Sequence, residues 1–171
     1  MTSTDEEARA LALLGEAGDA IVAGVARELP GWVERSVTRI LDAWGRTAPD
    51  VRERTEREAV AAGVAASARV VGELRALLAL DPAEQSATPL EIVRRAYREP
   101  TAVLAAVGIP GIEREEFDER AWPDDAYGLV IRGLRDLGPP GGDGDLGAYQ
   151  LAWGLAKAKV LRARVEADDR T

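Results

Sequence analysis

The sequence predicts an all-α protein, an antiparallel helical bundle of five to seven helices around a long third helix. Apolar residues recur at helical spacing along most of the chain, and capping motifs separate these segments. No segment of useful length shows the alternation of a β-strand. We expect residues 1–171 to form a single helical domain, because a chain of this length buries enough surface to fold without disulfides.

The first helix is predicted to begin with a capping box, because Ser3 stands three residues before Glu6. Its apolar stripe consists of Leu11, Leu14, Ile21 and Val25. Pro30 is expected to end or kink this helix, since proline lacks the N–H that a helix interior requires. A second helix is then predicted up to the region of Gly45, with a stripe of Val33, Val37, Ile40 and Trp44.

The longest predicted helix begins at Pro49 and ends near Leu80. Its apolar stripe is expected at Val60, Val64, Val71, Leu74 and Leu78. A second pattern places small side chains every four residues, at Ala59, Gly63 and Ser67. Because small side chains let two backbones approach closely, we expect these three residues to face another helix.

Capping motifs organise the second half of the chain. Asp81–Glu84 and Thr88–Glu91 each combine a capping residue, a proline and a glutamate, and each predicts a short helix. Pro100 is expected to kink or restart the second of these, and Gly108 to end it. An acidic loop (108–123), a helix from Trp122 and a loop rich in glycine and proline (138–147) follow. The last helix has a stripe of Tyr149, Trp153, Ala156 and Val160.

Composition excludes several classes of function. The chain has no histidine and no cysteine, so imidazole bases, thiolate nucleophiles and zinc sites built from these residues are absent. The net charge of −8 disfavours nucleic acid and anionic membranes as partners. No apolar run approaches the length of a membrane span, and the acidic N-terminus does not resemble a secretory signal. We therefore expect a cytoplasmic protein without a cofactor.

The strongest candidate site is the acidic and aromatic segment 111–129. Its candidate partner-binding residues are Phe117, Trp122, Asp124, Asp125 and Tyr127. The segment is punctuated by proline and glycine, as functional loops often are. It could present an aromatic anchor with an acidic rim to another protein, or hold a hard cation such as Mg²⁺. It could equally be a solvated loop that docks Phe117 and Trp122 into the core.

Two further groups of charged residues have alternative interpretations. Carboxylates at i,i+3 spacing, which hold Mg²⁺ in all-α nucleotide pyrophosphatases, occur at Glu53 with Glu56 and at Glu115 with Asp118. They make a Mg²⁺-dependent hydrolase of nucleotide-like substrates the alternative function. Arg94, Arg95 and Arg98 could bind an anion, but ion pairs with the acidic segment are favoured. Trp32, Trp44 and Trp153 are expected in the core.

Two stretches, FDERAWPDDAYGL (117–129) and LAWGLAKAKVLRARV (151–165), resemble segments shared by short, conserved, uncharacterised helical proteins of high-GC actinobacteria. The resemblance implies a cytoplasmic bacterial protein and supplies neither an activity nor site residues. The leading prediction is a non-enzymatic cytoplasmic helical protein that acts through protein binding or self-association, either with another protein or as a homo-oligomer.

Overall fold

The computed structural model describes residues 3–110 and 145–169, and every regular element in these ranges is helical. The elements are α1 (Ser3–Trp44), α2 (Pro49–Leu78), α3 (Pro89–Arg94), the 3₁₀ helix η1 (Arg95–Arg98), α4 (Glu99–Ala105) and α5 (Asp145–Asp168). The all-α class is confirmed. Four helices pack together, with α3, η1 and α4 following one another without a break, so the predicted count of five to seven is not confirmed. None of these helices has the length and apolarity that a membrane span requires.

Of the two predicted effects of Pro30, the kink stays a prediction, and the helix end is wrong, because α1 continues through this residue. The long helix α2 is consequently the second helix of the chain and not the third. The reason lies in the apolar stripe on both sides of the proline. Val25, Leu29, Val33 and Val37 follow one another at four-residue spacing, and all are fully buried. Burial of this stripe offsets the roughly 3 kcal/mol that an internal proline costs a helix.

The chain divides into two compact units, which are described separately. Unit 1 contains α1 up to Gly24, the chain from Leu74 to Glu91, and α5. Unit 2 contains the chain from Val25 to Glu73, and from Ile92 through α4. The single domain over residues 1–171 stays a prediction.

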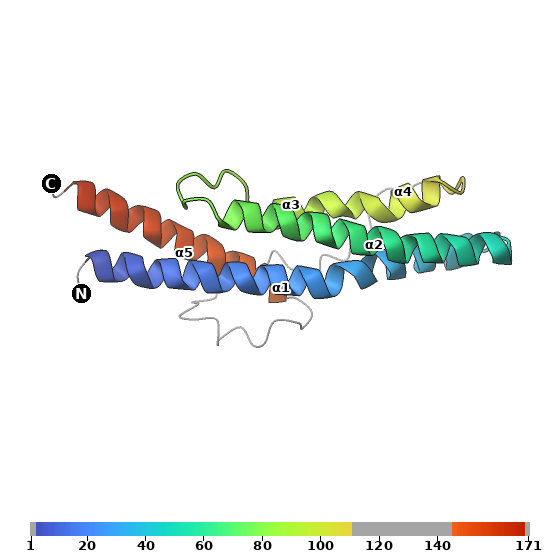
Figure 1. Cartoon of the computed structure of the whole chain (residues 1–171), viewed down its shortest axis with the longest axis horizontal. Coiled ribbons are helices and arrows are strands. Elements are labelled where there is room, and N and C mark those ends of the chain that lie inside the picture. The colour runs from blue at the N-terminus through green and yellow to red at the C-terminus, as the bar shows by residue number, and fades with distance from the viewer. Residues whose placement is uncertain (1–2, 111–144, 170–171) are drawn as a thin grey trace. The chain divides into compact units, whose positions relative to one another are not determined.

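Unit 2 is built on a helical hairpin, in which α1 and α2 run antiparallel (Figure 1). Gly45 ends α1 with φ +65°, near the predicted position. The segment from α3 to α4 also runs antiparallel to α2, because Arg95 pairs with Glu73 and Glu99 pairs with Arg69. A buried cluster joins the three layers and consists of Val37, Leu41, Ala59, Val103, Leu104 and Ile109.

The α4 terminus follows its local sequence. Gly108 has φ +76°, and the Ile109 N–H donates to the Leu104 carbonyl at 3.1 Å. This is the bond of a Schellman cap, which favours glycine at the left-handed position. The prediction that Gly108 ends this segment is confirmed.

The predicted apolar stripe of α2 is wrong at Val60 and Val64, although its Leu74 is fully buried. Val60 is 44% exposed and Val64 is 58% exposed, whereas the face with Ala59, Gly63 and Ser67 is buried. A Cβ atom on Gly63 would lie 2.6 Å from the carbonyl oxygen of Pro30. The expected close approach of a helix at the small residues is therefore confirmed, and its partner is α1.

Unit 1 packs α5 against the N-terminal part of α1. An ideal Cβ atom on Gly24 of α1 would lie 3.0 Å from the side chain of Leu146 in α5. One on Gly18 would lie 2.9 Å from the side chain of Leu78, at the end of α2. The predicted stripe of α5 is confirmed, because all four of its residues are buried (Tyr149, Trp153, Ala156, Val160). Leu11 is exposed, so its expected place in the stripe of α1 is wrong.

The chain between α2 and α3, residues 79–88, forms no helix; we call it the strap. Asp81 makes a single turn, accepting from the Glu84 N–H at 2.8 Å and, through its carboxylate, from the Ala83 N–H at 2.9 Å. The short helix predicted at Asp81 is therefore wrong. Pro89 disfavours a helical conformation at Thr88, so too few residues remain to continue past one turn. The capping box of Thr88 and Glu91 forms as predicted, with reciprocal bonds of 2.7 and 3.4 Å.

Candidate functional site

The sequence-predicted partner site lies outside the described residues. This holds for Phe117, Trp122, Asp124, Asp125 and Tyr127, for residues 111–123 of the acidic loop, and for residues 138–144 of the glycine-rich loop. All of them stay predictions. The functional argument from structure therefore begins with the surfaces of the two units.

The carboxylates of the alternative metal site are engaged by arginines on their own helix. Glu53 accepts from Arg57 at 2.5 Å, and Glu56 accepts from Arg52 at 3.0 Å. Glu115 and Asp118 lie outside the described residues. Within the described ranges no three acidic residues are grouped as metal ligands. The complete carboxylate quartet stays a prediction.

One member of the arginine group forms an ion pair within the described residues. Arg95 donates to Glu73 of α2 at 2.8 Å. The acidic segment downstream lies outside the described residues, so pairing with it stays a prediction. Arg94 and Arg98 are exposed on the same stretch of chain. The pairing of Arg95 ties η1 to α2 and removes one of the three charges from any anion site.

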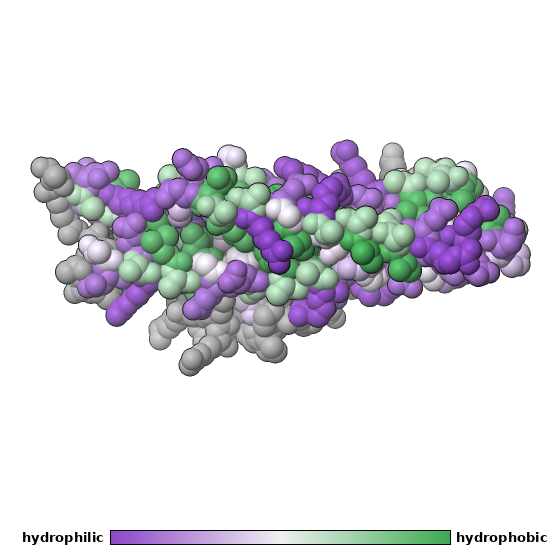
Figure 2. Space-filling model, viewed as in Figure 1, coloured by the Kyte–Doolittle hydropathy of each residue, from purple (hydrophilic) through white to green (hydrophobic). Residues whose placement is uncertain are grey.

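The outer face of α2 carries an exposed surface without charge. It consists of Val60, Ala61, Val64, Ala65, Ala68 and Gly72, all exposed, and we call it the α2 strip. It spans thirteen residues from Val60 to Gly72, or about 20 Å of helix. Figure 2 shows this as green and pale green along the middle of α2, with purple where the helix begins. Charges return on the same face at Arg57 and Arg75.

A sequence signal could have revealed the α2 strip. Residues 59–68 read AVAAGVAASA, with no charge on any side of the helix. A helix that is apolar all round requires cover all round. In unit 2, α1 covers the face with Gly63, and the segment from α3 to α4 pairs with Arg69 and Glu73. The third side is the exposed strip. The helix α2 therefore carries more apolar surface than the packing of unit 2 buries.

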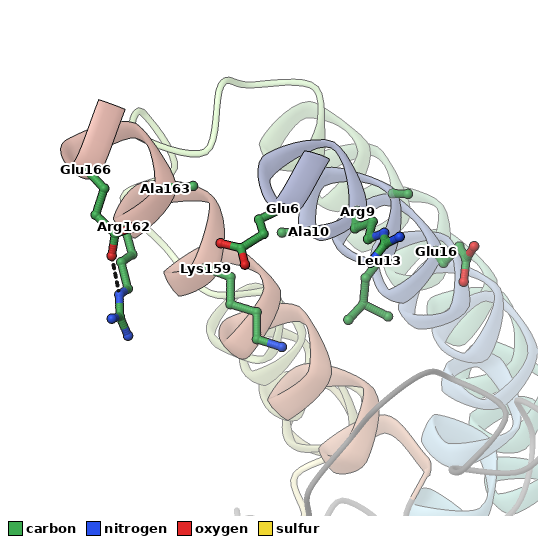
Figure 3. Close-up of a pocket in the computed structure, with 10 residues that line it drawn as sticks. Glu6, Arg9, Ala10, Leu13, Glu16, Lys159, Arg162, Ala163 and Glu166 are labelled. Atoms are coloured by element: carbon green, nitrogen blue, oxygen red, sulfur yellow. Dashed lines mark hydrogen bonds and ion pairs between the residues drawn. The ribbon is translucent and has the colours of Figure 1, made fainter. Parts of the chain in front are cut away.

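Unit 1 has a groove between the start of α1 and the end of α5 (Figure 3). Ala10, Leu13 and Ala163 supply apolar side chains. The charged residues that line it are Glu6, Arg9, Glu16, Lys159, Arg162 and Glu166. Arg162 donates to Glu166 at 2.8 Å. Because three acids and three bases line the same groove, a ligand of either charge would meet repulsion as well as attraction, and the groove selects neither.

The opposite flank of α5 holds the strap and the first turn of α3 through a row of polar side chains spaced by seven residues. Gln150 accepts from the Leu90 N–H at 3.2 Å, and Lys157 donates to the Gln85 carbonyl at 2.5 Å. Arg164 donates to both carboxylate oxygens of Asp81 at 2.8 and 3.0 Å, and also to Glu7 of α1 at 2.8 Å. Two turns of helix separate neighbouring anchors, so all three lie on one side of α5.

The Arg164 contact predicts a pH dependence of stability. The hydrogen bond from Arg164, assisted by the Ala83 N–H, lowers the pKa of Asp81 from its ordinary value of 3.8. A carboxylate with a lowered pKa stabilises the folded state above its unfolded pKa, and this contribution is lost as the pH falls through the folded pKa. We expect Asp81→Asn to lower the urea midpoint at neutral pH, and the two chains to converge in acid as the pH falls through the lowered pKa of Asp81. Asp19→Asn, at an exposed position of α1, is the control; a difference for Asp81→Asn that persists unchanged in acid would contradict the role of the charge.

The described residues therefore present one uncharged exposed surface, one groove of balanced charge, and one polar row that holds a non-helical segment. None of these features depends on the residues of the acidic loop. Comparison of the chain with protein-family models, with curated proteins and with solved structures finds no match.

Proposed function

We propose that this chain is a non-enzymatic helical protein that acts by self-association, and that the α2 strip is the surface through which two copies meet. The observation that carries the proposal is the exposure of Val60 and Val64 within an uncharged face. Contiguous exposed apolar surface of this kind is typical of protein–protein contacts. An uncharged face has no charged group through which it could recognise one particular other protein. Two identical apolar faces, in contrast, can cover each other in a twofold dimer.

The shape of the α2 strip supports helix-to-helix contact. Ala61, Ala65, Ala68 and Gly72 are small, so a second helix can approach closely, as α1 does at Gly63 on the opposite face. Val60 and Val64 stand beside this row and supply the larger side chains of the contact. Arg57 and Arg75 bound it, giving an apolar centre with a charged rim, which is the usual anatomy of an interface.

The size of the α2 strip sets the expected strength of association. A face about 20 Å long and about 10 Å wide covers on the order of 200 Å² per copy. A standard interface buries about 800 Å² per partner. The strip is therefore the centre of a larger contact, or the whole of a weak one, and we expect a reversible dimer that dissociates on dilution.

The proposal places this function in the cytoplasm, with a second copy of the chain as the partner and neither nucleic acid nor a membrane surface. The net charge of −8 supports this choice, because it repels phosphate backbones and anionic lipids. No chemical step is involved, so no cofactor is required.

A charge placed in the α2 strip tests the proposal. Ala65→Glu should abolish the dimer in sedimentation velocity across a concentration series, because a buried unpaired carboxylate is costly. Its thermal unfolding as a dilute monomer should match that of the wild type. Ala26→Glu makes the same change at an exposed position of α1 in the same unit and should leave association intact. A wild-type chain that is monomeric at the highest concentration, or equal association of both variants, would refute the proposal.

A further inference from the structure

We propose that the strap, residues 79–88, is a latch that opens as a local unit while α1 and α5 remain folded. This inference concerns unit 1 alone and is independent of the α2 strip. It rests on how the strap is anchored, on what it buries, and on what holds α5 without it.

The strap is anchored mainly by polar contacts. Most of its residues are exposed, and only Pro82 and Gln85 are buried. Asp81 and the Gln85 carbonyl are held by Arg164 and Lys157. The Asp81 side chain remains 44% exposed in this pair. Ion pairs so open to solvent contribute little to stability, and a segment with few buried apolar contacts is among the first to open.

The strap contains a buried polar atom that lacks a partner. Gln85 Oε1 is buried without a hydrogen bond to the described residues. The Gln85 carbonyl accepts from Lys157 Nζ, which also lies 5.2 Å from the centre of the Trp153 ring. Buried polar atoms without partners destabilise the state that buries them. Opening would hydrate Gln85 Oε1, so this cost falls on the closed state alone.

The helix beneath the strap has separate support. Tyr149, Ala152, Ala156 and Val160 of α5 are buried, and Leu146 packs against Gly24 of α1. The contact of Leu146 with Gly24 is apolar and involves neither Arg164 nor Lys157. Local opening therefore removes polar anchors while it leaves the apolar packing of α5 in place.

Native-state hydrogen exchange of the full chain in low concentrations of urea tests the latch. The amides of Ala83 and Glu84, which are hydrogen-bonded within the strap, should exchange faster than those of α5, with little dependence on urea. Equal exchange and equal urea dependence in the strap and α5 would show that the strap opens only in global unfolding, and would overturn the proposal. The wild-type measurement alone decides this point.

A matched pair of variants tests the anchor. Arg164→Gln should speed exchange of the strap amides several-fold and leave α5 unchanged. Arg162→Gln removes an arginine two residues away that pairs with Glu166 on its own helix, so the strap should exchange as in the wild type. Circular dichroism verifies that both variants are folded. Equal acceleration by the two variants, or none by Arg164→Gln, would refute the anchoring role.

Discussion

Replacement of Gly63 with alanine is expected to destabilise the protein, although alanine is the better helix former. The added Cβ would lie 2.6 Å from the Pro30 carbonyl oxygen and 3.1 Å from Pro30 Cα. Both are backbone atoms of a helix, so neither can rotate away as a flexible side chain could. Overpacking of this kind costs about 1–3 kcal/mol or more, which exceeds the helix propensity gain of up to about 1 kcal/mol. Gly63→Leu should cost at least as much.

Gly15 offers the matched control for this prediction. It is also a glycine inside a helix, but it is exposed, and nothing lies within 4 Å of its ideal Cβ. Gly15→Ala should therefore stabilise the protein by about 0.5–1 kcal/mol. Urea unfolding of the two variants measures the difference directly. If both variants gain stability, the close contact of Gly63 with Pro30 does not exist in solution.

Trp153→Ala is expected to have the largest effect of any single truncation proposed for this chain. Trp153 is 2% exposed in unit 1, so its removal leaves a large cavity. Truncation of a core tryptophan costs about 3–5 kcal/mol. Trp153→Phe should cost much less, because it keeps an aromatic ring and removes the buried Nε1 that has no partner among the described residues.

Trp44 is the control, because it is 41% exposed at the end of α1. Trp44→Ala should change the free energy of unfolding only slightly. This corrects the expectation that Trp32, Trp44 and Trp153 all lie in the core: Trp153 is buried, Trp32 is half-buried and Trp44 is exposed. Thermal unfolding of the variants separates the two environments. Equal destabilisation by Trp44→Ala and Trp153→Ala would contradict the burial described for both residues.

The two proposals use different physical features and can fail separately. Self-association depends on an apolar face of α2 in unit 2, and its readout is the mass of the particle in solution. The latch depends on polar anchors in unit 1, and its readout is the exchange of strap amides. Neither outcome depends on the acidic segment, whose candidate residues stay predictions.

Local signals in the sequence determined where several helices begin and end. The capping box at Thr88 and the terminators Gly45 and Gly108 all act as predicted. These helix ends can be predicted from the sequence because the motifs satisfy hydrogen bonds within a few residues of the chain, or adopt a backbone angle that favours glycine. The all-α class and the stripe of α5 follow from the same local periodicity.

Tertiary packing decided what local signals left open. Pro30 lies inside α1 because a stripe of buried apolar residues extends on both sides of it. Residues 59–68 present apolar or small side chains in every direction, so periodicity alone could not select the buried face of α2. The close approach of Pro30 to Gly63 selected the small face and left Val60 and Val64 exposed. The sequence by itself determined the all-α class and several helix ends. Only the contacts between helices decided that α1 continues past Pro30 and which faces remain exposed, because burial depends on what each face meets in space.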